Sequence, residues 1–141
     1  MTAIPLRQEA LRTTCILELY NTDYALNPYS DRLTSQGYEV VAARNYDEAL
    51  KLAHECDPVL ILVHDDLAAD VDALRWLEMQ HTDRASWLAM TPLMILADAE
   101  RVPTLRAEEL PDRVIVLQKR ADTLNQLNRA VKRLLRLWQL E

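Results

Sequence analysis

Glycine is almost absent from this sequence, since Gly37 is the only one among 141 residues. A phosphate-binding loop needs several glycines so that backbone amides can surround the anion, and nucleotide binding by such a loop is therefore excluded. No apolar run approaches the roughly 20 residues that span a bilayer. The opening residues, MTAIPLRQEALRTT, contain no apolar signal segment. We therefore expect a cytoplasmic protein that does not enter a membrane.

Cysteine is also scarce. The two cysteines, Cys15 and Cys56, lie far apart in the chain and in apolar or helical surroundings. This arrangement is typical of buried, reduced thiols rather than of a disulfide framework or a zinc site.

The net charge of −6 is unevenly distributed. Residues 119–141 contain six basic and two acidic residues, a net charge of +4, and the rest of the chain has a net charge of −10. The acidic bulk argues against nonspecific binding of nucleic acid. The basic segment is either a solvated helix face or a contact for an acidic partner.

Short apolar runs alternate with segments of helical periodicity along the chain. The runs predict strands at 15–20, 38–43, 59–64, 92–98 and 113–119, and the periodic segments predict helices at 27–37, 45–56, 70–81 and 121–140. Such alternation predicts an α/β fold with a doubly wound parallel sheet. In the helix at 70–81, the candidate buried residues are Leu74, Leu77 and Met79.

Two local signals refine this pattern. Gly37 stands where a helix would end, which predicts a left-handed backbone conformation at that residue. Between the last two strands, Pro103 and Pro111 interrupt the chain, and each would break the interior of a helix. The segment 104–110 therefore allows at most two helical turns, and we expect a short or displaced fourth helix.

Several stretches carry a resemblance to a known family: "ILELYN", "GYEVVAARNYDEALKLAHECDPVLILVH", "TPLMILAD" and "LQK". Over roughly residues 14–136 the chain resembles the receiver domain of two-component response regulators. The resemblance implies a flavodoxin-like sheet of five strands in the order 2-1-3-4-5, formed by residues 14–141 behind an N-terminal extension, 1–13. It also implies a site at which an aspartate accepts a phosphoryl group with the help of Mg²⁺.

The residues at the family's site positions are not those of the family. The acidic pair falls on Tyr20 and Asn21, the phosphoacceptor on His64, the Thr or Ser on Ala97, the lysine on Lys119, and the aromatic switch on Val116. Only Lys119 matches. Phosphoryl transfer needs a carboxylate nucleophile and oxygen ligands for a hard cation, so the resemblance implies a pseudo-receiver with no catalytic residue, no cofactor and no enzymatic activity.

Other interpretations of the polar residues stay open. His64 is either a neutral histidine hydrogen-bonded inside the pocket, with Tyr20 as a candidate partner, or a ligand of a transition metal together with Asp23, Asp65 or Asp98. The second option would make the protein a sensor of a metal or small ligand.

A conventional receiver would need Asp65 or Asp66 as the phosphoacceptor. Strand alternation, however, points Asp65 away from His64, and Asp66 already lies in a loop. Asp70 and Asp72 are expected to cap the next helix rather than bind calcium, because the glycine of a calcium loop is missing. Lys119 either holds a small anion or pairs with an acid.

The terminal helix has a wider apolar stripe than packing on a sheet requires. Leu137, Trp138 and Leu140 extend the stripe and have no obvious partner within the fold, so they are a candidate interface. The alternative is that they pack against Ile4, Leu6 and Leu11 of the N-terminal extension. We therefore expect a stand-alone signalling protein that works independently of phosphorylation, through a homodimer or another protein partner.

Overall fold

The computed structural model describes residues 15–22 and 27–139, with the side chains of 137–139 left out. Five apolar runs form the parallel strands: β1 (Cys15–Leu19), β2 (Glu39–Ala43), β3 (Leu60–His64), β4 (Leu93–Ala97) and β5 (Val114–Gln118). Their order in the sheet is β2-β1-β3-β4-β5. Every residue of β1, β3 and β4 is buried, as expected for strands covered on both faces. The predicted fold class and strand order are confirmed.

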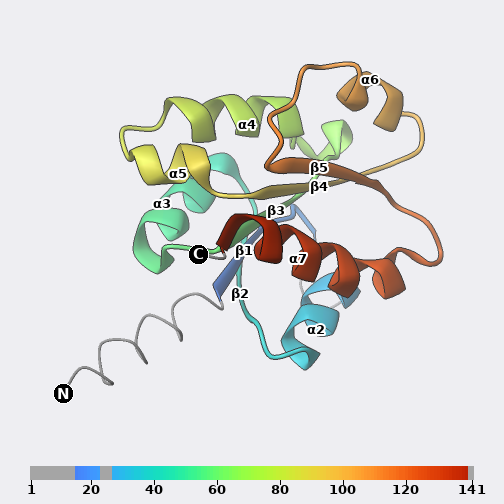
Figure 1. The fold of residues 1–141 in the computed structure, drawn as a ribbon. Coiled ribbons are helices and arrows are strands. Elements are labelled where there is room, and N and C mark those ends of the chain that lie inside the picture. Colours follow the sequence, from blue (N-terminus) through green and yellow to red (C-terminus); the bar gives the residue numbers. More distant parts are fainter. Residues whose placement is uncertain (1–14, 23–26, 140–141) are drawn as a thin grey trace.

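Helices cover both faces of this sheet (Figure 1). One face carries α3 (Tyr46–Cys56), α4 (Ala73–Thr82), α5 (Ser86–Met90) and α6 (Val102–Arg106), and the other carries α2 (Pro28–Ser35) and α7 (Thr123–Gln139). Each face has its own hydrophobic cluster, with Trp76 of α4 in the first and Leu127, Val131 and Leu134 of α7 in the second. No helix in the described part of the chain is long and apolar enough to cross a membrane.

Helix ends follow the local sequence signals. Pro28 begins α2, and Asn27 caps it by accepting hydrogen bonds from the amides of Tyr29 and Ser30. Gly37 follows α2 with φ of 96°, the left-handed conformation predicted for it. Asn45 caps α3 and Asp72 caps α4.

Two predictions about helices were wrong in detail, and one short helix was not predicted. Helix α4 begins at Ala73, and its buried residues are Ala73, Trp76 and Gln80, while the predicted Leu74, Leu77 and Met79 are only partly buried. Asp70 does not cap α4 but adopts a left-handed conformation (φ 62°) after a short 3-10 helix, Leu67–Ala69. The sequence analysis also did not predict helix α5.

The fourth helix is short, as predicted, but it lies earlier in the chain than 104–110. It is the five-residue α6, and Pro103 lies in its first turn, where a proline removes no helical hydrogen bond. Arg101, at the start of α6, forms an ion pair with the buried Asp65 at the end of β3 (2.8 Å). This ion pair holds the loop after β4 against the end of β3.

Candidate functional site

The carboxyl edge of the sheet places a buried histidine beside a buried glutamate. His64 ends β3, and Glu18 lies in the neighbouring strand β1 with its side chain on the same face. The His64 Nε2 atom lies 2.6 Å from Glu18 Oε2, and both side chains are fully buried. Because a buried charge needs a partner, this contact explains how the apolar strand β1 accommodates a glutamate.

Asn27 completes the network around the glutamate. Its Nδ2 donates to Glu18 Oε1 (2.8 Å), while its Oδ1 caps α2. The carboxylate thus bonds to one donor on each oxygen, and the start of α2 is joined through Glu18 to the end of β3.

Aromatic rings surround His64. The ring of Tyr20 stacks on it with centroids 3.6 Å apart and planes 8° from parallel, and Tyr29 contacts it edge-on at 4.9 Å. The Lys119 ammonium lies 5.1 Å from the Tyr20 ring centroid, a cation–π geometry. Burial lowers the pKa of Lys119, while Asp98 and Asp66 act in the opposite direction. At the position that the resemblance assigns to the phosphoacceptor, the fold therefore holds a ring cluster made of Tyr20, Tyr29 and His64.

Protonation of His64 is opposed by its surroundings. Burial lowers its pKa, and the hydrogen bond with Glu18 only partly offsets this effect. Its Nδ1 atom is buried and has no hydrogen-bond partner among the described residues. A proton on Nδ1 would therefore be an unsatisfied buried donor, which favours the neutral ring with Nε2–H donating to the Glu18 carboxylate.

We expect the free energy of unfolding to fall as the pH is lowered from about 7 to about 5. Below the ordinary histidine pKa of 6.5 the unfolded chain binds a proton at His64 that the folded chain resists, so acid favours unfolding by up to about 1.4 kcal/mol per pH unit. Urea unfolding at several pH values measures the slope. His64→Gln, which keeps a neutral donor for Glu18, should have a shallower slope, and equal slopes would contradict this account.

The other predicted site residues do not join this group. Asn21 donates to the carbonyl oxygen of Ala69 (2.8 Å) in the short 3-10 helix. Ala97 and Val116 are buried in the cluster on the opposite face of the sheet. Of the predicted pocket positions, the structure brings together Tyr20, His64 and Lys119.

Asp65 points to the opposite side of the sheet from His64. Its Oδ1 accepts a hydrogen bond from the amide of Ala73 at the start of α4 (2.9 Å), and Arg101 bonds to both carboxylate oxygens. The residue is 1% exposed. A carboxylate held in this way is a structural anchor, with its oxygens already occupied.

The sequence analysis did not find Glu18, Asn27, Tyr29 or Arg101. It named Tyr20 as a candidate hydrogen-bond partner of His64, but Tyr20 stacks on the ring and Glu18 makes the hydrogen bond. One signal was available, since Glu18 and His64 are charged or polar residues within otherwise apolar strands, and such residues need buried partners. The predicted metal ligand Asp23 lies outside the described residues, and these residues contain no group of three or more His, Cys, Asp or Glu that could hold a metal ion.

Comparison with solved structures gives many matches to receiver domains. The receiver domain of the hybrid histidine kinase CckA is 24% identical, with a TM-score of 0.64 over 86% of this chain and 98% of that one. A receiver protein from Sinorhizobium medicae WSM419 is 18% identical, with a TM-score of 0.72 over 92% and 99% of the two chains. A receiver domain of a histidine kinase from Syntrophus aciditrophicus is 19% identical, with a TM-score of 0.74 over 92% and 95%.

The chain has the fold of a response-regulator receiver domain. No model of a protein family matches its sequence, and no curated protein does either. At 18–24% sequence identity these matches show that the fold is shared.

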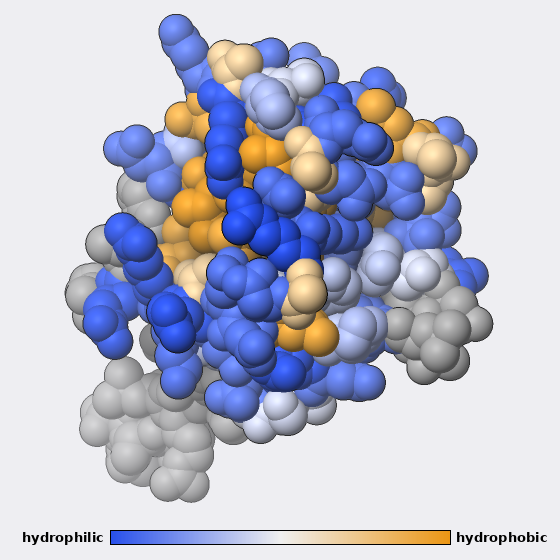
Figure 2. Space-filling view, turned by 90° about the vertical axis from the view of Figure 1, so that its right-hand side faces the viewer, coloured by the Kyte–Doolittle hydropathy of each residue, from blue (hydrophilic) through white to orange (hydrophobic). Residues whose placement is uncertain are grey.

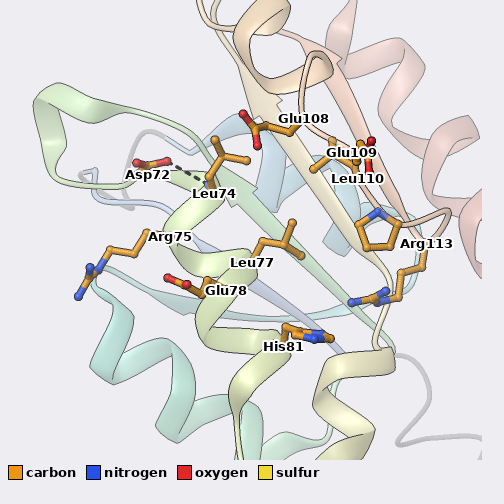
Figure 3. Close-up of a pocket in the computed structure, with 11 residues that line it drawn as sticks. Asp72, Leu74, Arg75, Leu77, Glu78, His81, Glu108, Glu109, Leu110 and Arg113 are labelled. Atoms are coloured by element: carbon orange, nitrogen blue, oxygen red, sulfur yellow. Dashed lines mark hydrogen bonds between the residues drawn. The ribbon is translucent and has the colours of Figure 1, made fainter.

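Two of the hollows on the surface of the described residues border β5 or the loop that precedes it. One, of about 570 Å³, lies between β5 and α7, and it has apolar side chains of Ile115, Leu117 and Leu134. The other, of about 630 Å³, lies between α4 and the loop before β5, where the Arg113 guanidinium extends towards His81 and Leu77 (Figure 3). Neither hollow is lined by Tyr20, Tyr29 or His64.

Proposed function

We propose that this chain is a signalling protein that uses the receiver fold without phosphorylation and acts by binding a protein partner. The observation that carries the proposal is the residue found where the resemblance places the phosphoacceptor. It holds a fully buried histidine, bonded to Glu18 and stacked under Tyr20. On this proposal the chain catalyses no reaction of its own.

Phosphoryl transfer to this site would need an accessible carboxylate. His64 offers none, its Nε2–H is engaged by Glu18, and its unprotonated Nδ1 is buried away from any phosphodonor. Asp65, the adjacent carboxylate, is buried and paired with Arg101. Tyr20 and Asn21 provide no carboxylate for Mg²⁺, which prefers such oxygens.

The surface between β5 and α7 supports binding of a protein. Strand β5 is the edge of the sheet, and Ile115 and Leu117 on it are only partly buried. The hollow beside them is bordered by the basic side chains Arg129 and Arg133. Figure 2 shows apolar surface exposed between hydrophilic side chains on the side of the molecule where the strands end. An apolar centre with a charged rim is the usual composition of a protein interface.

The candidate interface residues Leu137, Trp138 and Leu140 would continue this surface along the chain. Their side chains lie outside the described part of the structure, and their role stays a prediction. The same holds for the N-terminal extension, 1–13, as an alternative partner for them. A homodimer is the first form of association to test.

We expect the protein to self-associate through the β5–α7 surface, and Leu117→Glu to weaken association about tenfold or more, because a charge in an apolar interface centre costs at least about 1.4 kcal/mol. Sedimentation equilibrium measures the dissociation constant. Met90→Glu is the matched control, since Met90 is exposed at the end of α5 and should leave association unchanged. Trp138→Ala should act like Leu117→Glu.

A monomeric wild type at high concentration would rule out the homodimer. A dimer weakened equally by Leu117→Glu and Met90→Glu would place the interface elsewhere. If His64→Ala altered association while Leu117→Glu did not, the ring cluster would be the functional surface and a sensor would be the better account.

A further inference from the structure

The two cysteines, far apart in sequence, meet at the amino edge of the sheet. Cys15 is the first residue of β1 and Cys56 is the last residue of α3. Asp57 ends α3 in a left-handed conformation (φ 50°), and the chain then turns so that the amide of Val59 donates to the carbonyl oxygen of Cys15 (2.9 Å). This turn places the end of α3 beside the start of β1, and the two thiols are near enough that each shifts the pKa of the other. Both cysteines are free thiols.

The two thiols have different surroundings. Cys15 is 2% exposed, whereas Cys56 is partly exposed at the end of its helix. The neighbouring Cys15 thiol lowers the pKa of the Cys56 thiol, although burial and the carboxylates of Glu39 and Asp57 oppose this effect. The Cys56 thiol, together with burial, in turn raises the pKa of Cys15. Cys56 is thus the thiol that solutes can reach and that more readily ionises, while Cys15 remains protonated beside it.

We propose that Cys15 and Cys56 form a reversible intramolecular disulfide when the protein meets a hydroperoxide. The Cys56 thiolate attacks the terminal peroxide oxygen, the O–O bond breaks, and the leaving group, which is hydroxide when the oxidant is hydrogen peroxide, takes up a proton to become water. This step oxidises Cys56 to a sulfenic acid and reduces the peroxide. The Cys15 sulfur then attacks the sulfenic sulfur, the S–O bond breaks, and the Cys15 proton leaves with the hydroxyl group as a second water.

The product would join the first residue of β1 to the last residue of α3 by a covalent bond. In a reducing compartment the two cysteines would normally be thiols. The disulfide would form only during exposure to an oxidant, and small thiols would then reduce it. The site lies at the amino edge of the sheet, opposite the ring cluster, so it is independent of the proposed function.

The test is treatment of the fully reduced full-length chain with hydrogen peroxide. We expect the intact mass to fall by two hydrogen atoms, the count of titratable thiols to fall from two to none, and a peptide pair linking Cys15 to Cys56 to appear. Dithiothreitol should reverse all three changes. Retention of both thiols, formation of disulfide-linked dimers only, or conversion of Cys56 to sulfinic acid while Cys15 stays reduced would each overturn the proposal.

Two variants assign the roles of the cysteines. In Cys15→Ser the sulfenic acid has no resolving thiol, and dimedone should label Cys56. In Cys56→Ser no dimedone adduct should form, because the remaining thiol is buried. Labelling of Cys15 instead of Cys56 would overturn the assignment. Should Cys15→Ser fail to fold, Cys15→Ala provides the same readout with an apolar side chain in the core.

Discussion

We expect His64→Asp to destabilise the protein by about 3–5 kcal/mol and not to create a phosphoacceptor. The substitution puts an aspartate at the position where receivers carry their phosphoacceptor, so resemblance alone suggests a gain of activity. The structure suggests the opposite. Glu18 lies 2.6 Å from the His64 ring and is fully buried. A second carboxylate would replace a hydrogen-bond donor by a like charge and would remove the ring that stacks on Tyr20.

Urea unfolding of three variants tests this explanation. His64→Asp should be the least stable. His64→Gln should lose less, because a neutral amide can still donate to Glu18. The double variant Glu18→Val, His64→Asp should recover part of the loss, since it removes the opposing carboxylate from the strand. If His64→Asp is as stable as the wild type, the Glu18–His64 contact does not organise this edge of the sheet.

The second large effect is expected for Trp76→Ala, which should lower the free energy of unfolding by about 3–5 kcal/mol. Trp76 of α4 is fully buried, and its Nε1–H donates to Oε1 of Gln80 (2.9 Å). Gln80 in turn donates to the carbonyl oxygens of Leu88 and Thr91, which join α4 to α5. Removing the indole leaves a cavity and deprives a buried amide oxygen of its donor.

The control for this variant is Trp87→Ala. Trp87 lies in α5, is 39% exposed, and contacts the ring of His54 edge-on. Its loss should cost less than about 1 kcal/mol. Equal effects of the two tryptophan substitutions in chemical unfolding would show that the Trp76–Gln80 network does not anchor α4.

The strands could be predicted from sequence because their apolar runs are short, continuous and bounded by turns. The helix registers were harder to predict. In α4 the polar Gln80 occupies a buried position, and a hydrophobic pattern cannot reveal the burial of a polar residue. The pattern therefore favours Leu74, Leu77 and Met79 over Trp76. Helix α5 has only five residues, and Leu88 is its single buried side chain. So short a helix gives no periodic hydrophobic signal.

The site was predictable only in part, for a physical reason. Spacing placed His64 at the phosphoacceptor position, but spacing along one strand does not say which residue of the next strand faces it. That depends on the pairing of β1 with β3, which brings Glu18 alongside His64. The same holds for Asp65, whose partner Arg101 lies 36 residues away and immediately precedes α6, a helix that the proline pattern located only approximately.

We propose that the carboxyl edge of this receiver fold carries out no phosphoryl chemistry. The most direct test of this proposal is the intact mass of the wild-type protein after incubation with acetyl phosphate and millimolar Mg²⁺, beside a conventional receiver domain as the positive control. We expect the mass to stay that of the unmodified chain while the control gains one phosphoryl group. A stable phosphoryl adduct that peptide mapping assigns to Asp65 or Asp66 would contradict the account.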